Sequence, residues 1–399
     1  MMNILYISVL CGFTEPKSGG QNRIYNIAKQ LLKNKNKVVI LEPRIYFNKE
    51  DVKIAKIYLY DDLKILSREI NLSKDFNMDF ILTVRKIIKE NNIEMIHFSH
   101  PSGVLAIKIL TKLMGITIPI IYDSQNVESD FVSDVFKDSN KFSIIEKKII
   151  LIYVYLLERF TIKHIADHIT AVSKDDKNRF ISKYNVNNEK ISLIPSGSNI
   201  RQLPSESEKY KIKKLFNINP SVITIVFHGS FSHLPNQKAF ELIKNVIAPE
   251  FKDDDILFIV GGSGFPIYSK SNVKSIGFIE NMNDFLKMSD IAIVPITQGG
   301  GTRIKILDYL GAGLPLVTTK KGVEGIEVKH CRDAIIVENV DTKFINSIRF
   351  LIDNEKNRMK IAENARNLSK KYYDWDIIGK KLMYMYKKFD SHDKFNPNE

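Results

Sequence analysis

The sequence predicts an α/β protein of two doubly wound, Rossmann-like domains whose sheets face a common cleft. The chain has 399 residues, more than a single domain usually holds. Short apolar, β-branched runs alternate with segments of helical spacing almost throughout, and this alternation is typical of parallel sheets covered by helices on both faces. The alternation stops at the polar stretch 198–210, as at a linker between domains.

The first half, residues 1–200, is expected to form the N-terminal domain. Helical spacing of apolar residues appears at 22–33 and 76–91. Apolar runs of strand length predict strands at 3–10, 37–43, 95–100, 118–124, 168–173 and 191–197.

The second half repeats the pattern over residues 201–375 and ends in a helix. The final stretch, 374–389, carries an apolar stripe through Ile377, Leu382 and Tyr386. Strands are expected at 222–229, 256–262, 273–278, 291–296, 314–319 and 334–339.

Composition narrows the class of protein. A net charge of +13 favours anionic partners. The two cysteines, Cys11 and Cys331, lie too far apart in sequence for a disulfide framework or a zinc motif, and favour a reducing cytoplasm. The N-terminus has no basic leader, and the apolar run Ile149–Leu157 is too short to cross a membrane. We therefore expect a cytoplasmic protein.

A glycine-rich turn follows the predicted strand at 291–296, in the stretch "PITQGGGTRIKILDYLGAGLP". Glycines let a ligand approach the backbone, and the start of the following helix favours an anion. Asp308, farther along the helix, suits the paired hydroxyls of a ribose better than a phosphate. These features predict a nucleoside-diphosphate sugar, although a glycine turn with a surface Lys305–Asp308 pair is the alternative interpretation. The residues expected to hold the diphosphate are Gly300, Gly301, Thr302, Arg303 and Lys305.

This segment resembles the C-terminal signature of retaining glycosyltransferases of the group-1 type (family 4), which have the GT-B fold. That family typically carries two glutamates separated by seven residues. Here the first position falls on Gly300 and the second on Asp308, a "GGGTR" variant. The resemblance implies that 1–200 binds the acceptor, that 201–375 binds the donor, and that the C-terminal helix, 376–399 with its tail, packs back on the first domain.

Other stretches match the family in the same order along the chain. "SGGQNRIYNIAKQL" (18–31) resembles the glycine loop that meets the diphosphate from the first domain, which implies that role for Gly19 and Gly20. "SIGFIENMNDF" (275–285) resembles the turn that contacts the nucleotide base, which implies that role for Phe278 and Ile279.

Two departures from the family bear on chemistry. Ser230 stands where many members have an arginine that clamps the diphosphate, so Arg303, with Lys305, is expected to supply that charge. Gln125 stands in "YDSQNVES" where histidine is common, and glutamine keeps a hydrogen bond but exchanges no proton. Gln125 and His100 are the candidate catalytic residues.

The implied reaction moves a sugar from a nucleoside-diphosphate donor to an acceptor hydroxyl with retained anomeric configuration. The acceptor is expected to be a glycan, a glycolipid or a lipid-linked glycan, and neither a cofactor nor a metal is expected. Two alternatives remain: a nucleotide-sugar epimerase of the same fold, and a non-catalytic nucleotide-sugar-binding subunit. Scattered lysines without interleaved aromatic residues argue against a nucleic-acid partner.

The stretch 141–163 is apolar nearly all round between basic ends. We interpret it as a buried helix of the first domain. The alternative is a helix that faces an anionic membrane surface, which would make the protein a peripheral one.

Overall fold

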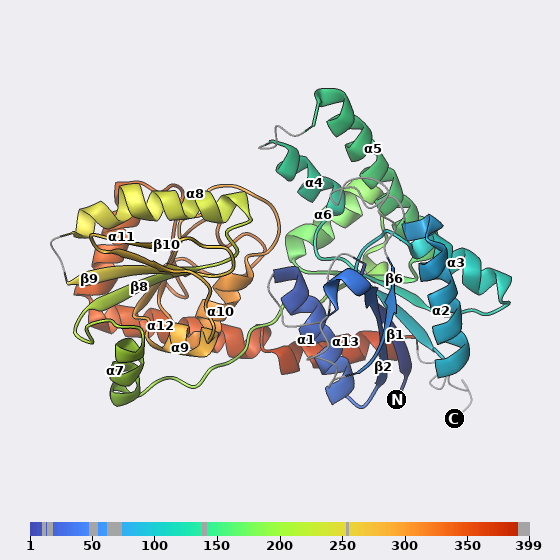
Figure 1. The fold of residues 1–399 in the computed structure, drawn as a ribbon, viewed down its shortest axis with the longest axis horizontal. Helices are drawn as coiled ribbons and strands as arrows, with labels where there is room; N and C mark the ends of the chain where they lie inside the picture. Colours follow the sequence, from blue (N-terminus) through green and yellow to red (C-terminus); the bar gives the residue numbers. More distant parts are fainter. Residues whose placement is uncertain are drawn as a thin grey trace. The chain divides into compact units, whose positions relative to one another are not determined.

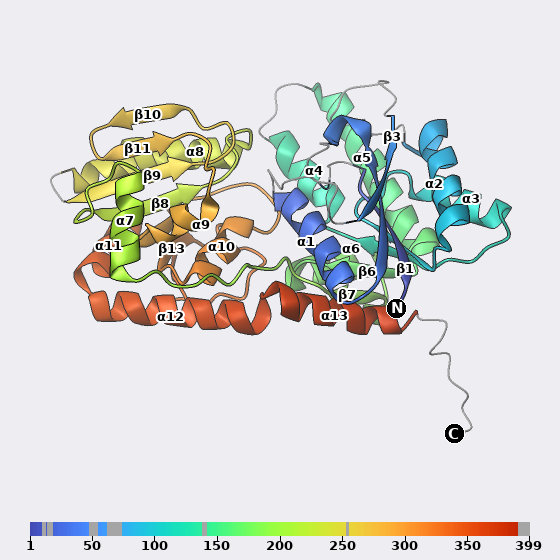
Figure 2. The ribbon, with the colours of Figure 1, turned by 60° about the horizontal axis from the view of Figure 1, so that its bottom comes forward.

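The computed structural model describes residues 1–9, 13, 19–47, 55–61, 74–137, 142–252 and 255–389. The chain divides into two compact units: unit 1 is Met1–Pro195 with Ile378–Glu399, and unit 2 is Ser196–Ile377. Within the described residues each unit is built on a seven-stranded sheet, with helices on both faces of the sheet (Figures 1 and 2). The α/β class and the two doubly wound sheets predicted from the sequence are therefore confirmed. Cys11 lies outside the described residues.

The sheet of unit 1 has the order β3-β2-β1-β4-β5-β6-β7, and its paired strands are parallel. The chain moves outward from β1 to β3 and then returns to the other side of β1 with β4, so the order reverses between β1 and β4. The strands are β1 (Asn3–Ile7), β2 (Lys37–Pro43), β3 (Lys56–Tyr60), β4 (Met95–Phe98), β5 (Ile120–Asp123), β6 (His168–Ala171) and β7 (Ile191–Leu193).

In unit 1, α1 and α13 lie on one face of the sheet and α2 and α3 on the other (Figure 1). Helix α13 (Trp375–Lys387) belongs to unit 1 from Ile378 onward. The other helices are α1 (Gly19–Lys33), α2 (Met78–Asn91), α3 (Val104–Leu113), α4 (Glu128–Lys137), α5 (Ile144–Phe160) and α6 (Lys174–Tyr184), with short turns at Arg44–Tyr46, Lys74–Phe76, Thr161–Ile165 and Asn188–Lys190.

Strand β1 shows why its apolar run is continuous. Successive side chains of a strand point to opposite faces, and both faces of this strand are covered. Leu5 and Ile7 pack in the hydrophobic cluster that includes α2 and α3. Tyr6 points the other way and stacks edge-on against His97, which hydrogen-bonds Tyr386 of α13. The C-terminal helix is thus part of the core of unit 1.

The sheet of unit 2 has the order β10-β11-β9-β8-β12-β13-β14, and here the strand order reverses between β8 and β12. Its pairs are parallel except for β10 with β11. The strands are β8 (Ile223–His228), β9 (Ile256–Gly261), β10 (Ile267–Lys270), β11 (Val273–Ile276), β12 (Ile291–Val294), β13 (Leu316–Thr319) and β14 (Ile335–Val337).

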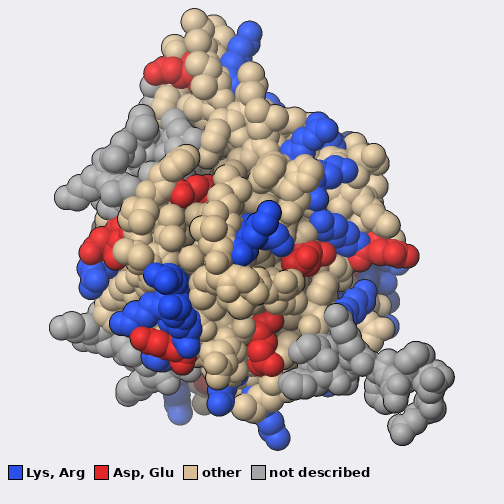
Figure 3. All heavy atoms as spheres, turned by 90° about the vertical axis from the view of Figure 1, so that its right-hand side faces the viewer, with Lys and Arg blue, Asp and Glu red and all other residues tan. Residues whose placement is uncertain are grey.

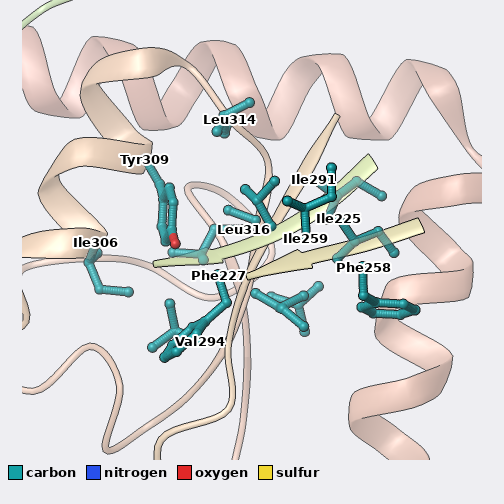
Figure 4. Close-up of a cluster of buried hydrophobic side chains, with 14 of the residues drawn as sticks. Ile225, Phe227, Phe258, Ile259, Ile291, Val294, Ile306, Tyr309, Leu314 and Leu316 are labelled. Atoms are coloured by element: carbon teal, nitrogen blue, oxygen red, sulfur yellow. The ribbon is translucent and has the colours of Figure 1, made fainter. Parts of the chain in front are cut away.

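Helices α8 and α12 lie on opposite sides of this sheet (Figure 1), and the core between the layers is made by aliphatic and aromatic side chains such as Ile225, Phe258 and Leu316 (Figure 4). The helices are α7 (Glu206–Leu215), α8 (Leu234–Leu242), α9 (Met282–Lys287), α10 (Ile304–Ala312), α11 (Thr342–Asp353) and α12 (Glu355–Tyr372), with short turns at Ile243–Ile247 and Ala248–Phe251.

Helix α5 differs from the buried helix that we expected at 141–163. Among its described residues Ile150 and Glu158 are buried, whereas Ile145, Ile149 and Ile152 are 71%, 62% and 60% exposed. The expectation of burial was wrong because α5 packs on unit 1 along a narrow strip only. None of the helices in the described ranges is both long enough and apolar enough to cross a membrane.

Candidate functional site

The carboxyl ends of β8 and β12 mark the reversal of strand order in unit 2. Ligands of open α/β sheets bind at such a reversal. His228 is the last residue of β8, and the glycine turn 299–301 follows β12 and leads into α10. The structure therefore places the predicted turn where a binding site is expected.

The glycine turn is held by Arg303. Gly299 and Gly301 have φ angles of +93° and +79°, which only glycine adopts without strain. The guanidinium of Arg303 donates to the carbonyls of Gly300 and Gly301, and its Nη2 lies 2.6 Å from the Gly299 oxygen. Arg303, which precedes α10, thus shapes the turn. Its predicted contact with a diphosphate remains a prediction.

Lys305, in the first turn of α10, reaches the loop after β8. Its Nζ donates to Oδ1 of Asn236 at 2.6 Å and lies 3.9 Å from the ring centroid of Phe227. The residue is 8% exposed. Burial, with Arg303 as the smaller cause, lowers the pKa of the amine well below its usual value. A methyl group on Gly229 would lie 2.8 Å from Nζ, so the amine faces a bare stretch of backbone.

Asp308 forms no ion pair with Lys305 in the structure, which argues against the alternative of a simple surface pair. Its carboxylate is 13% exposed and faces Arg201 at 3.8 Å and Nε2 of His228 at 3.7 Å. Burial raises the pKa of Asp308 to about 6, although Arg201 opposes the shift. Burial also holds the pKa of His228 well below its usual value, with Lys305 and Arg201 acting in the same direction.

The other predicted residues of unit 2 lie around the same edge or near it. The Oγ1 atom of Thr302 is buried and has no hydrogen-bond partner among the described residues. Phe278 and Ile279 follow β11 after Gly277, whose φ is +69°. Phe278 is 60% exposed and Ile279 is 7% exposed, so the aromatic ring, and not the isoleucine, is open to a ligand.

In unit 1, Gly19 and Gly20 begin α1, and Gln125 lies over Gly20. A methyl group on Gly20 would come within 2.6 Å of Oε1 of Gln125. Gln125 follows β5 and is half-buried. The structure thus brings together one predicted loop residue and one predicted catalytic candidate.

His100 follows β4, beside the reversal of strand order in unit 1. Its Nε2 lies 3.7 Å from Oε2 of Glu128, and its Nδ1 accepts a hydrogen bond from the backbone of Ser102. The imidazole is therefore oriented from both sides. An acidic partner of this kind suits an oriented proton carrier as well as a structural histidine.

The sequence analysis missed a buried ionic network beneath these residues. Arg23 of α1 donates to both carboxylate oxygens of Asp123 at the end of β5, over 2.5 and 3.2 Å. Thr170 donates to the same carboxylate, and His97 lies 3.5 Å from it. Burial alone would raise the pKa of Asp123, but Arg23 and His97 hold it well below its usual range. Two sequence features could have revealed the network. Arg23 lies one helical turn after Gly19 and Gly20, and Asp123 lies at the end of a predicted strand.

A second buried acid, Glu158 of α5, caps the start of α4. Its carboxylate accepts from the backbone N–H groups of Glu128 and Ser129 at 2.9 and 3.3 Å, and from Tyr184. Burial and the neighbouring Glu128 raise the pKa of Glu158 to about 7. This contact fixes α4, and with it Glu128, beside His100.

Among the described residues no group of three or more His, Cys, Asp or Glu side chains is arranged to hold a metal ion. The buried carboxylate of Asp123 contacts Arg23, Thr170 and His97 instead, and that of Glu158 accepts from backbone N–H groups.

Comparison with known proteins places both units in related families. A family model described as "Glycosyl transferases group 1" matches residues 222–354, and one described as "Glycosyltransferase Family 4" matches residues 17–202. A glycosyltransferase of Methanocaldococcus jannaschii, itself described as uncharacterised, is 28% identical over 237 residues. That match covers 56% of this chain and 58% of the relative, little more than half of either.

Solved structures share the whole fold. Sucrose-phosphate synthase from Thermosynechococcus elongatus superposes with a TM-score of 0.74 at 13% identity, over 97% of this chain and 99% of that one. HepE of Anabaena, solved with UDP-glucose, gives 0.71 at 14% identity, over 97% and 100%. WaaG, a glycosyltransferase involved in lipopolysaccharide biosynthesis, gives 0.70 at 15% identity, over 96% and 99%. At these identities the likeness concerns the fold, GT-B.

Proposed function

Because the chain belongs to the group-1 glycosyltransferases, we propose that it transfers a sugar from a nucleoside-diphosphate donor to an acceptor hydroxyl with retention of configuration. The donor binds unit 2. The acceptor, a glycan or lipid-linked glycan, binds unit 1. HepE was solved with UDP-glucose, which supports a uridine nucleotide as the first donor to examine.

The observation that carries the proposal is the grouping of Asp308, Lys305 and the glycine turn at the reversal of strand order in unit 2. Asp308 is largely buried and lacks a close ion pair, since both basic partners lie more than 3.5 Å from it. It is therefore available to accept hydrogen bonds from ribose hydroxyls. The start of α10, with Lys305 in its first turn, offers backbone N–H groups and the positive end of the helix dipole to the diphosphate.

The residues in place suit stabilisation of the leaving group. As the bond between sugar and diphosphate breaks, negative charge grows on the departing phosphate oxygen, and preorganised donors at that position lower the barrier. Arg303 keeps the glycine turn in shape for this task. The departing oxygen itself takes the proton of the acceptor hydroxyl, so no protein base is required, and His100 and Gln125 orient the reacting sugar or acceptor. Such a site needs neither metal nor cofactor.

The acceptor is proposed to be presented at an anionic membrane surface. Exposed Ile145, Ile149, Ile152 and Leu156 of α5 are spaced by four, three and four residues and so form one apolar stripe. Lys148, Arg159 and Lys163 are exposed along the same segment. An apolar stripe between cations suits a bilayer with anionic headgroups.

Figure 3 views unit 1 from the right-hand side of Figure 1. Basic and acidic side chains are interspersed over this face, and no continuous basic tract covers it. The top, the end of unit 1 that carries α5, is largely uncharged, with both acidic and basic side chains at its edges. The pattern resembles a membrane-facing edge more than a nucleic-acid surface.

The membrane proposal is tested by flotation with vesicles of phosphatidylglycerol and of phosphatidylcholine. We expect the wild-type protein to float with anionic vesicles at low salt, and the Ile149→Ser/Ile152→Ser/Leu156→Ser variant to stay in solution. Leu215→Ser/Met359→Ser removes apolar side chains that are 75% and 64% exposed on unit 2 and should float like the wild type. If the wild-type protein does not float with anionic vesicles, the membrane proposal is contradicted, whereas the proposal of sugar transfer is not affected.

The transferase proposal is tested first by calorimetric binding of UDP, GDP, dTDP and ADP. We expect one nucleotide to bind and Asp308→Ala to weaken it at least about tenfold, the value of one or two lost hydrogen bonds to a charged group. Asp353→Ala, an exposed acid of unit 2, is the control and should bind normally. Failure of all four nucleotides to bind would contradict the proposal.

The alternatives are separated by what happens to the corresponding nucleotide sugar. Nucleoside diphosphate released only when a glycan or lipid extract is added indicates a transferase. Conversion without acceptor indicates an epimerase, and binding without any conversion indicates a binding subunit.

A further inference from the structure

The amine of Lys305 is buried without a counter-charge. Within the described ranges no carboxylate forms an ion pair with it, and its hydrogen-bond partner is the neutral amide oxygen of Asn236. By contrast Lys213, which is also buried in unit 2, pairs with Asp290 at 2.8 Å. A buried ammonium without an anion is costly and tends to lose its proton.

Among the described residues, the charged and titratable groups that face Lys305 are all bases. His228 ends β8, His233 precedes α8, and Arg303 precedes α10; burial lowers the pKa of both histidines, and a positive charge on Lys305 would lower it further. The positive charge of Arg303 in turn lowers the pKa of Lys305, although burial is again the larger cause. Asp308, the carboxylate of this site, faces Arg201 and His228 instead. The position is built for an anion.

The backbone of Gly229 lies directly beside the amine of Lys305. A methyl group on Gly229 would lie 2.8 Å from Nζ and 2.7 Å from Nδ2 of Asn236, so glycine at this position lets both side chains approach the backbone of the loop after β8. Asn236 is itself held, because its Nδ2 donates to the Ser230 carbonyl at 2.7 Å. The short side chain of Ser230 adds no charge of its own. Arg303 is engaged with the carbonyls of the glycine turn, so Lys305 is the cation that points toward the loop after β8.

We propose that Lys305 and Asn236 form a proton-coupled clamp for the donor diphosphate: the amine is uncharged in the unliganded protein, rests on Asn236, and takes up a proton from solvent as the diphosphate enters. The step forms one N–H bond on Nζ, breaks the bond that held this proton in a hydronium ion or buffer acid, and breaks no bond of the donor. The resulting ammonium pairs with a phosphate oxygen, while Asn236 holds the stem in place. Asn236 is thus a positioning residue. The inference rests on the proposed function, since it requires a nucleoside-diphosphate ligand.

The test is calorimetric titration at pH 8.5 with the nucleoside diphosphate that binds best, in buffers of different ionisation enthalpy. At this pH the terminal phosphate, whose second pKa is about 6, is already ionised, and so is Asp308, whose pKa is about 6. Uptake measured there reports Lys305. We expect the wild-type protein to take up about one proton per nucleotide bound.

Lys305→Met should bind at least about tenfold more weakly and take up no proton. Lys213→Met, the matched buried lysine with an acidic partner, should take up protons like the wild type. Asn236→Asp gives the amine a permanent counter-charge, so uptake should disappear while the protein still folds. Without nucleotide, Lys305→Met should melt at a higher temperature than the wild type, because it removes a desolvation cost; a structural lysine would show the opposite.

Three results overturn the inference. Nucleotide binding to the wild type without proton uptake contradicts the coupling, and unchanged binding by Lys305→Met contradicts the clamp; both leave the transferase proposal standing. Absence of binding by every nucleotide contradicts the proposed function itself, and the clamp with it.

Discussion

Nε2 of His228 lies 3.7 Å from Oδ2 of Asp308, and burial drives both groups toward their neutral forms. The imidazole has no hydrogen-bond partner for this nitrogen within the described residues. A ligand that donates hydrogen bonds to Asp308 would therefore meet a carboxylate whose charge is set by burial and not by a salt bridge. We therefore expect the affinity for the donor to depend on whether the carboxyl group of Asp308 is ionised.

The first prediction concerns the pH dependence of donor affinity. Ribose hydroxyls donate to the ionised carboxylate, and the pKa of Asp308 is raised to about 6. The ionised fraction therefore rises about tenfold between pH 5 and pH 7, and the dissociation constant of the nucleotide sugar should fall by about the same factor. Calorimetry over this range checks it. Asp308→Asn should bind weakly at every pH. Because proton uptake by Lys305 would weaken binding as pH rises, the comparison is made in the Lys305→Met background, where an affinity that stays flat would contradict the assignment.

The fold was predictable because its signal is local and repeated. Continuous apolar runs such as β1 reflect burial on both faces of a parallel sheet. Strands β3 and β10 were not predicted. The alternating "KIYLY" of β3 is a readable strand signal, whereas the exposed "IYSK" of β10 is held by antiparallel pairing at the sheet edge, which sequence pattern alone does not reveal.

The site was predictable only where its residues lie close together in sequence. The glycine turn and Asp308 share one segment, and spacing on a helix relates them. The contact of Lys305 with Asn236, and that of Arg23 with Asp123, join residues 69 and 100 positions apart. Such pairs follow from strand order, so they appear only once the sheet is assembled. The sequence also did not show where the Arg303 and Lys305 side chains point. Both were expected to face the diphosphate, but Arg303 donates to the carbonyls of the glycine turn and Lys305 donates to Asn236.

The second prediction concerns the buried pair of Arg23 and Asp123, whose side chains are 2% and 0% exposed. Arg23→Met removes the guanidinium from a buried carboxylate that keeps only Thr170 and His97 as the other neighbours named above, and it should cost about 3–5 kcal/mol of unfolding free energy. Arg44→Ala breaks a pair that is 58% and 68% exposed and should cost less than about 1 kcal/mol. Urea unfolding followed by circular dichroism measures both. Equal losses would contradict a specific role for the buried pair.

The pair of Arg23 and Asp123 also predicts how the stability of the protein changes with pH. The pKa of Asp123 in the folded protein lies well below its usual value, with Arg23 and His97 overcoming the effect of burial. Its stabilisation is therefore fully present at neutral pH, and it is lost as pH falls below the ordinary aspartate value. The stability difference between wild type and Arg23→Met should shrink as the solution is acidified below about pH 4. A difference that grows on acidification would contradict this.

The third prediction concerns Glu158, whose effect on stability changes with pH in the opposite direction to that of Asp123. Glu158 is buried, and its pKa is raised from 4.5 to about 7 by burial and by Glu128. The folded state then binds the proton more tightly than the unfolded state, so stability falls as pH rises from about 4.5 to 7, by roughly 3 kcal/mol in all. Glu158→Gln should gain stability over the wild type at pH 8 and little at pH 4.5. Thermal melts at both values measure it.

Glu146 on the same helix is the matched control. It forms the capping box of α5 with Ser143, and that contact lowers its pKa. Glu146→Gln should therefore slightly destabilise the protein above the ordinary glutamate pKa and should not stabilise it at pH 8. A gain for both variants would indicate a general effect of removing negative charge rather than the burial of Glu158.

The fourth prediction separates two roles for the start of α1. Gly20 adopts helical backbone, so alanine there is not strained and should favour the helix by about 0.5–1 kcal/mol. Its methyl group would, however, meet Oε1 of Gln125 at 2.6 Å and turn that side chain away. Gly20→Ala should therefore keep or raise the melting temperature while lowering turnover at least about tenfold, if Gln125 orients the substrate.

A double-mutant cycle decides how Gly20 acts. If the methyl group acts through Gln125, then Gly20→Ala should cause little further loss of turnover in a Gln125→Ala background, because the affected side chain is already gone. If the backbone at Gly20 instead touches the diphosphate, as the family resemblance implies, then the loss caused by Gly20→Ala should be equally large in both backgrounds and should appear as weaker nucleotide binding. Measuring kcat and KM for the four proteins distinguishes the two, since a lost orienting contact lowers kcat, whereas a blocked phosphate contact raises KM for the donor.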